Sequence, residues 1–145
     1  MKKLAVAFAV ALMLLVPFLA GFAEETQITE IDMDLSAMNA NINYAQMVQV
    51  LNNPSAFAGK TICVKGKFNY SEASGRAKII FSDAAGCCEI AMEFVPGTVM
   101  NYPEDYPALY TDIVVVGRLE AGGDAGEKWI RIEDAMLIRP DQTAK

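Results

Sequence analysis

Residues 60–70 read KTICVKGKFNY, and this stretch sets the fold class. Apolar residues alternate here with polar or basic ones, which is the period of a β-strand with one buried and one solvent-facing side. Four later segments are also predicted to be strands: residues 77–82, 87–95, 113–120 and 129–138. We expect the last of these to break near residues 133–135. The chain therefore predicts an all-β domain.

The spacing of the strands predicts their topology. The first three are close enough in sequence to form a meander, and residues 96–110 separate them from a final hairpin. A meander and a hairpin joined in this way are the layout of an OB-fold barrel, and Gly66 and Gly117 suit its tight bends. We expect a five-stranded OB-fold-like barrel with a short N-terminal helix and a helix or loop between strands three and four. A sandwich of five or six strands is the alternative.

The short helix is expected over residues 43–51. Its apolar side chains recur at i, i+3, i+4 and i+7: Tyr44, Met47, Val48 and Leu51. Asn41 or Asn43 is suited to cap its start, and Asn52-Asn53-Pro54 ends it. A helix this short persists only where it docks, so we expect its apolar face to pack against the core.

Residues 1–23 have the pattern of a secretory signal. Lys2 and Lys3 precede an uncharged apolar run, and Gly21-Phe22-Ala23 places small residues at a cleavage site. Phe22 stands where a lipobox would need its cysteine, so lipidation is excluded. We expect cleavage and export to the periplasm, the cell envelope or the medium. An uncleaved anchor is the alternative and is the only membrane link that we expect.

The mature chain divides into three parts by composition. Residues 24–42 are polar and acidic, with no clear period, and are predicted to be a flexible spacer. Residues 43–139 form the predicted domain, and residues 140–145 are expected to fray. We expect a monomer.

Charge and composition exclude several functions. The chain has 145 residues, 18 of them acidic and 12 basic, and it has no histidine. A net charge of −6 argues against a general nucleic-acid binder. The missing histidine excludes Ser-His-Asp and Cys-His catalysis and His-ligated zinc. No two carboxylates stand out as an acid–base pair. We therefore predict a binding protein without catalytic residues.

The cysteines are the most unusual feature. If the first hairpin turns near residues 73–74, Cys63 lies close to Cys87 and Cys88, so all three thiols gather toward one end of the barrel. Neighbouring thiols in an exported protein tend to oxidise, and we expect a disulfide from Cys63 to Cys87 or Cys88. Buried reduced cysteines are the first alternative.

Three functional alternatives also remain for the thiols. They are a vicinal Cys87–Cys88 disulfide, a redox-active pair and a thiolate site for a soft metal such as Cu(I) or Zn. Three thiolates without histidine suit Cu(I) better than a closed zinc site, which would need a further ligand such as Asp83 or Glu89. The chain has no CxxC motif, so the pattern favours an oxidoreductase only weakly.

Basic residues gather on the first two predicted strands: Lys60, Lys65, Lys67, Arg76 and Lys78. OB-folds often bind ligands in this region. The candidate ligand-binding face consists of five residues: Lys65, Lys67, Asn69, Arg76 and Lys78. It would suit an anionic ligand, such as an oligosaccharide, a phosphate-bearing polymer or a peptide of an envelope protein. The alternative is a solvated strand face that keeps the barrel soluble.

Several segments resemble a group of small exported bacterial OB-fold proteins. The resemblance begins with NPSAFAGK at residues 53–60 and VKGKF at residues 64–68. It continues with Cys87-Cys88 leading to MEFV at residues 92–95 and with YPEDYP at residues 102–107. It covers roughly residues 44–138 and implies an OB-fold. Many members are described only as uncharacterised proteins or lipoproteins, so it implies neither catalytic residues nor a ligand.

Overall fold

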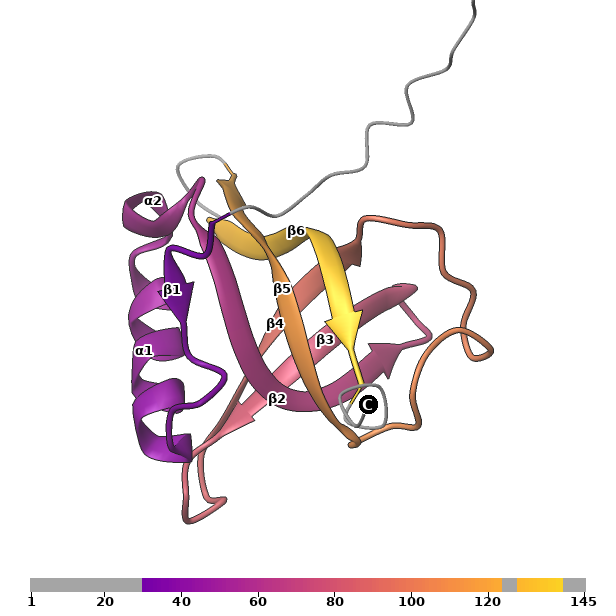
Figure 1. Cartoon of the computed structure of the whole chain (residues 1–145), viewed down its shortest axis with the longest axis horizontal. Coiled ribbons are helices and arrows are strands. Elements are labelled where there is room, and N and C mark those ends of the chain that lie inside the picture. Colours follow the sequence, from indigo (N-terminus) through magenta and orange to yellow (C-terminus); the bar gives the residue numbers. More distant parts are fainter. Residues whose placement is uncertain (1–29, 124–127, 140–145) are drawn as a thin grey trace, which may run out of the picture.

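Figure 1 shows the protein as a computed structural model, which describes residues 30–123 and 128–139. The predicted signal at residues 1–23 and the predicted tail at residues 140–145 lie outside the described residues. The helices are α1 (Ala40–Asn52) and α2 (Pro54–Phe57). The strands are β1 (Met33–Asp34), β2 (Thr61–Ser71), β3 (Arg76–Ser82), β4 (Glu89–Pro96), β5 (Asp112–Gly122) and β6 (Trp129–Ile138). Within these ranges no helix has the length and apolar character needed to cross a membrane.

Five of the strands close into a barrel in the order β2-β3-β4-β6-β5, with β5 pairing back onto β2. The β4–β6 contact is parallel, whereas the other barrel pairs are antiparallel. The predicted all-β, OB-fold-like barrel of five strands is therefore confirmed. The sandwich alternative is wrong, because the β2–β5 pairing joins the two ends of the sheet into one closed wall.

Two glycines allow the strands to bend as the barrel closes. β2 pairs with β5 from Thr61 to Lys67 and with β3 from Lys67 onward, so it changes partners next to Gly66. A Cβ on Gly66 would overlap the Ile80 carbonyl oxygen. A Cβ on Gly117 would lie 2.7 Å from the Glu133 carbonyl oxygen. Only glycine permits such close backbone approach.

The break that we predicted near residues 133–135 is confirmed. The register between β5 and β6 shifts between Val116 and Arg118, where β6 carries one extra residue. Asp134 adopts a positive φ of 51° at this point. Such a bulge bends a strand and increases its twist, which helps a small barrel to close.

Helix α1 packs on the barrel through a face that overlaps the predicted one but is rotated from it. Met47 is buried, and Tyr44 and Leu51 pack against the core as predicted, but the other buried residues are Asn43 and Val50. The cap is also different, because the Asn39 side chain accepts a hydrogen bond from the Ile42 amide. The Asn43 side chain donates to the Lys65 carbonyl oxygen at 2.6 Å, which turns this polar residue toward β2. The helix therefore docks by a mixture of apolar contact and one buried hydrogen bond.

The described part of the predicted spacer belongs to the fold. Met33 and Asp34 pair in parallel with Ile62 and Cys63 of β2, and α1 begins at Ala40. Leu35, which follows β1, is buried in the core. The start of the domain therefore lies upstream of residue 43. Sequence periodicity did not indicate this because a two-residue strand is too short to show a period.

The connection between β4 and β5 is a loop of turns that carries a cluster of aromatic rings. Tyr102 stacks on Tyr70 with ring centroids 3.9 Å apart, and Tyr106 stacks on Phe68 at 5.3 Å. Both loop tyrosines pack against the core. In Figure 1 this loop lies on the far side of the barrel from α1, so the barrel is flanked by the helix and the tyrosine loop.

Candidate functional site

A groove of about 580 Å³ crosses the neighbouring strands β3, β4 and β6. We call it the cationic groove and define it by six polar or aromatic lining residues: Arg76, Lys78, Glu93, Lys128, Trp129 and Arg131. Arg76 and Lys78 come from β3, Glu93 comes from β4, and the other three come from the start of β6 or the residue before it. Oligosaccharide and oligonucleotide sites of OB-folds use this strand face and the loop before the last strand.

The Glu93 carboxylate lies between the two cationic side chains of β3, Arg76 and Lys78. One of its carboxylate oxygens lies 2.8 Å from Arg76 Nη1, and the other lies 3.9 Å from Lys78 Nζ. Cross-strand pairing explains this contact, because Lys78 stands opposite Glu93 in the β3–β4 register. The side chains remain partly exposed. A carboxylate therefore fits between these two cations while they stay accessible to solvent.

On the β6 side, Trp129 supports Arg131. The Arg131 guanidinium lies over the indole ring, 4.6 Å from the ring centroid, and Arg131 also pairs with Glu133. The ring is placed by Gly122, its cross-strand neighbour, where a Cβ would lie 2.7 Å from the indole Cε2. A guanidinium held over an aromatic face by a cation–π contact keeps its edge free for an acceptor.

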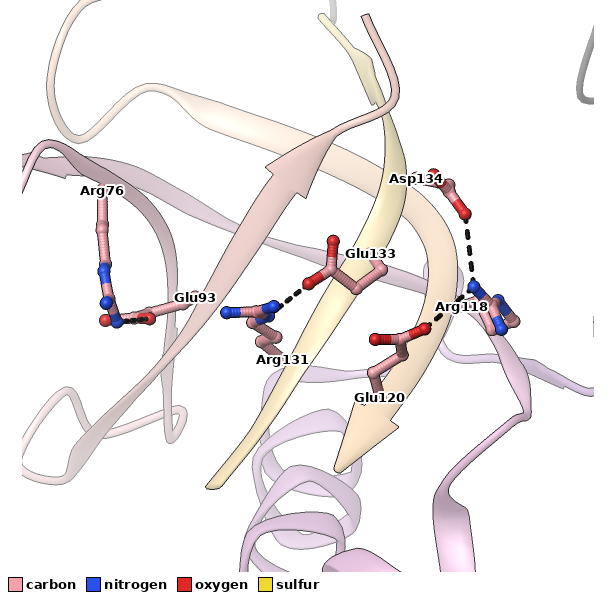
Figure 2. Close-up of polar contacts among 7 residues, drawn as sticks. All are labelled: Arg76, Glu93, Arg118, Glu120, Arg131, Glu133 and Asp134. Atoms are coloured by element: carbon pink, nitrogen blue, oxygen red, sulfur yellow. Dashed lines mark hydrogen bonds and ion pairs between the residues drawn. The ribbon is translucent and has the colours of Figure 1, made fainter. Parts of the chain in front are cut away.

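Figure 2 shows how the pairs on β3, β4 and β6 lie relative to one another. Arg76 and Arg131 stand on either side of Glu93, and Glu133 lies beyond Arg131. The groove therefore places four cations near two carboxylates, in a chain whose net charge is −6. This local excess of positive charge opposes the sign of the whole molecule and favours an anionic ligand.

The candidate ligand-binding face divides in two in the structure. Arg76 and Lys78 line the cationic groove, and Asn69 stands opposite Lys78 in the register. Lys65 and Lys67 line a different groove, of about 320 Å³. Lys67 pairs there with Asp112 at 3.5 Å. The separation arises because β2 leaves β3 near Gly66 and continues beside β5.

Lys60, the fifth of the clustered basic residues, lies with its ammonium over the Phe57 ring, 5.2 Å from the centroid. It belongs to neither groove. The sequence pattern did not indicate that Lys128, Trp129 and Arg131 belong to the groove. The signal that could have indicated them is the predicted OB-fold order, which places the fifth strand beside the third and so brings residues 128–131 next to Glu93.

The three cysteines do not gather as we predicted. Cys63 is 6% exposed and stands opposite Asp34 and Val116, while Cys87 and Cys88 are exposed on the turn between β3 and β4. All three are free thiols, so the expected disulfide from Cys63 is wrong for this structure. The prediction assumed that β2 pairs with β3 along its whole length. Residues 61–66 pair instead with β5, which takes Cys63 away from the turn.

Cys87 and Cys88 have a different neighbour, the Asp83 carboxylate. The two sulfur atoms are 3.6 Å apart, and Cys87 Sγ donates to Asp83 Oδ2 at 3.2 Å. This hydrogen bond is the main cause that raises the pKa of Cys87 to about 11, and it lowers the pKa of Asp83 below its ordinary value. A thiol with a raised pKa is a poor nucleophile at neutral pH, which disfavours the redox-pair alternative.

No protein-family model matches the chain, and no curated protein matches it. The resemblance to exported OB-fold proteins therefore stays a prediction. The fold itself rests on the strand order and pairing of the barrel, and the candidate sites rest on the geometry of the cationic groove and of the β3–β4 turn.

Proposed function

We propose that this protein is an exported, non-enzymatic binding module and that the cationic groove binds an acidic oligosaccharide. The observation that carries the proposal is the convergence of four cations from β3 and β6 on one groove of an acidic chain. The groove lies on the face and beside the loop that OB-folds use for oligomeric ligands. Glu93 marks a position where a carboxylate is held by Arg76 and Lys78.

The chemistry of the groove favours a short acidic sugar chain over a nucleic acid. Single-stranded nucleic acids bind to OB-folds through bases that stack on exposed aromatic rings. Trp129 is the aromatic ring lining this groove, and Arg131 lies over it. A net charge of −6 would also repel a long polyanion outside the groove. A few spaced carboxylates on a sugar chain match the few cations that the groove offers.

The test uses Trp129, which is the only tryptophan in the chain and lines the groove, so its fluorescence reports occupancy. We expect tetragalacturonic acid to change the emission saturably and neutral maltotetraose to leave it unchanged. Raising the salt concentration should weaken binding, because exposed charges are screened.

Two matched variants locate the site. Arg76→Gln removes a cation from the groove and should weaken binding about tenfold, since a hydrogen bond to a charged group contributes about 1.5 kcal/mol or more. Arg118→Gln removes the same charge from a pair with Glu120 and Asp134 outside the groove, and it should leave the affinity unchanged. Equal binding of the neutral sugar, equal loss in both variants, or no binding at all would refute the proposal.

A further inference from the structure

The turn between β3 and β4 carries a second site of a different kind. Among residues 30–123 and 128–139, Asp83, Cys87 and Cys88 form a group whose possible ligand atoms all lie within 4.8 Å of one another. Both cysteines are exposed, so an ion can reach them from solvent. The turn lies at the opposite end of the β3–β4 hairpin from the paired Arg76 and Glu93, so this site is separate from the cationic groove.

The turn holds these ligand atoms in place through its own hydrogen bonds. Asp83 Oδ1 accepts from the Cys87 amide at 3.0 Å, and the Asp83 amide donates to the Cys88 carbonyl oxygen at 3.1 Å. Gly86 has a positive φ of 67° and donates to the Asp83 carbonyl oxygen. The carboxylate and both thiols are thereby brought to one side of a closed turn.

Helix α1 anchors the turn from outside. The Asn41 side-chain oxygen accepts from the Ala84 amide at 2.8 Å. Figure 1 shows the tip of the hairpin beside the first turn of α1. The turn that carries the cluster is therefore tied to the helix by this hydrogen bond.

We propose that Asp83, Cys87 and Cys88 bind one zinc ion, with the fourth position open to water or an external ligand. With zinc–sulfur bonds of about 2.3 Å, two thiolates of a tetrahedral centre lie about 3.8 Å apart. The two sulfur atoms are 3.6 Å apart in the structure. A thiolate and a carboxylate oxygen of such a centre lie about 3.6 Å apart, and here the distance is 3.2 Å. These two distances differ from those of a zinc centre by only a few tenths of an ångström, and the remaining pair, Cys88 and Asp83, lies within 4.8 Å.

The donor set also selects the metal. The sequence favoured Cu(I) on the premise that three thiolates act together, but Cys63 is not part of this group. Two thiolates and one hard carboxylate oxygen suit zinc, which accepts sulfur and oxygen ligands together. Binding replaces both thiol protons, which pass to the solvent, and no electrons are transferred. Three protein ligands and an open position are typical of an exchangeable site rather than a closed structural one.

The first experiment measures metal binding by the full chain, reduced with a phosphine that does not bind metals. Cd²⁺ serves as a probe, because bonds to thiolates give ultraviolet charge-transfer absorption, and Zn²⁺ is measured by competition with a chromophoric chelator. We expect one equivalent of each ion per chain. Added Zn²⁺ should also raise the melting temperature, because a ligand that binds only the folded state stabilises it.

Four variants test the ligand set. Cys88→Ser and Asp83→Asn should each weaken zinc binding by more than about tenfold. Tenfold is the smallest loss in affinity that is typical for a residue that only supports a metal ligand, and a direct ligand should matter more. Cys63→Ser and Asp134→Asn remove a distant thiol and a distant carboxylate, the latter paired with Arg118 beside the far end of β4, and should leave the affinity unchanged. Circular dichroism checks that each variant folds, which is expected at the half-buried position 83 and the exposed position 88.

Three results would overturn the zinc site. The first is the absence of charge-transfer absorption when Cd²⁺ is added to the reduced protein. The second is an equal effect of Asp83→Asn and Asp134→Asn, which would show that the Asp83 carboxylate does not take part. The third is a Cys87–Cys88 disulfide in protein isolated from its native envelope. That bond requires the sulfurs to approach from 3.6 Å to about 2.05 Å and would remove both thiolates.

Discussion

Replacing Glu93 by Gln should raise the affinity of the cationic groove while lowering the stability of the fold. Glu93 lies 2.8 Å from Arg76 and 3.9 Å from Lys78, and these side chains are partly exposed. Surface ion pairs of this kind contribute about 0.2–1 kcal/mol each. With two such pairs lost, we expect Glu93→Gln to lose up to about 2 kcal/mol of stability and to melt several degrees lower.

The gain in affinity has an electrostatic cause. A ligand carboxylate beside Arg76 would lie about 6 Å from Glu93, and two charges at that distance repel by about 0.7 kcal/mol in water and by about 2.8 kcal/mol at an effective dielectric constant of 20. The groove is open to solvent, so we take about 1 kcal/mol, which is about a fivefold gain in affinity. The Gln amide keeps an acceptor for Arg76 and avoids a new cavity.

The assay combines Trp129 fluorescence titration with tetragalacturonic acid and thermal unfolding followed by circular dichroism. Glu120→Gln is the matched control, because it removes one carboxylate that pairs with Arg118 at 2.9 Å and does not line the groove. We expect the control to bind like the unmodified protein. If Glu93→Gln binds no more tightly than Glu120→Gln, the cationic groove is not where the acidic ligand sits, and the reasoning is refuted.

Three other predictions concern the fold, the thiols and the N-terminus. Gly66→Ala should destabilise the barrel by about 1–3 kcal/mol or more in urea unfolding, because the new Cβ would overlap the Ile80 carbonyl oxygen; an unchanged midpoint would contradict this close approach. In the reduced native protein, the two exposed thiols should react with an alkylating reagent before unfolding, with Cys87 slowed by its raised pKa, and Cys63 should react only after unfolding; three equally fast thiols would contradict the burial of Cys63. The intact mass of protein isolated from its native envelope should match a chain that starts at Glu24, because the signal is expected to be cleaved after Ala23. A mass that includes residues 1–23 would indicate an uncleaved anchor.

The strands were predictable because their period of two is a local property of the sequence. The predicted ranges 60–70 and 129–138 differ from the observed β2 and β6 by at most one residue at either end. The break near Asp134 was also predictable, because polar residues interrupt the apolar alternation there. The buried face of helix α1 was harder to predict, because it depends on the hydrogen bond from Asn43 to Lys65, which joins residues 22 positions apart.

The candidate functional sites depend on contacts that no local pattern contains. The cationic groove exists because β6 lies parallel to β4, which brings Trp129 and Arg131 beside Glu93 although they are more than 30 positions apart in the chain. The sequence indicated Arg76 and Lys78 through their clustering on one strand. It did not indicate their partners, because each partner's place follows from the closure of the barrel.

The sequence by itself determined that this chain has five barrel strands, an acidic net charge, no histidine and three cysteines. Tertiary structure alone decided which cysteines lie together. The bend at Gly66 turns the first half of β2 toward β5, so Cys63 is buried there and Asp83 takes its place beside Cys87 and Cys88. The physical reason is that closing a sheet into a barrel forces its first strand to share its length between two neighbours, and that division is set by the whole barrel.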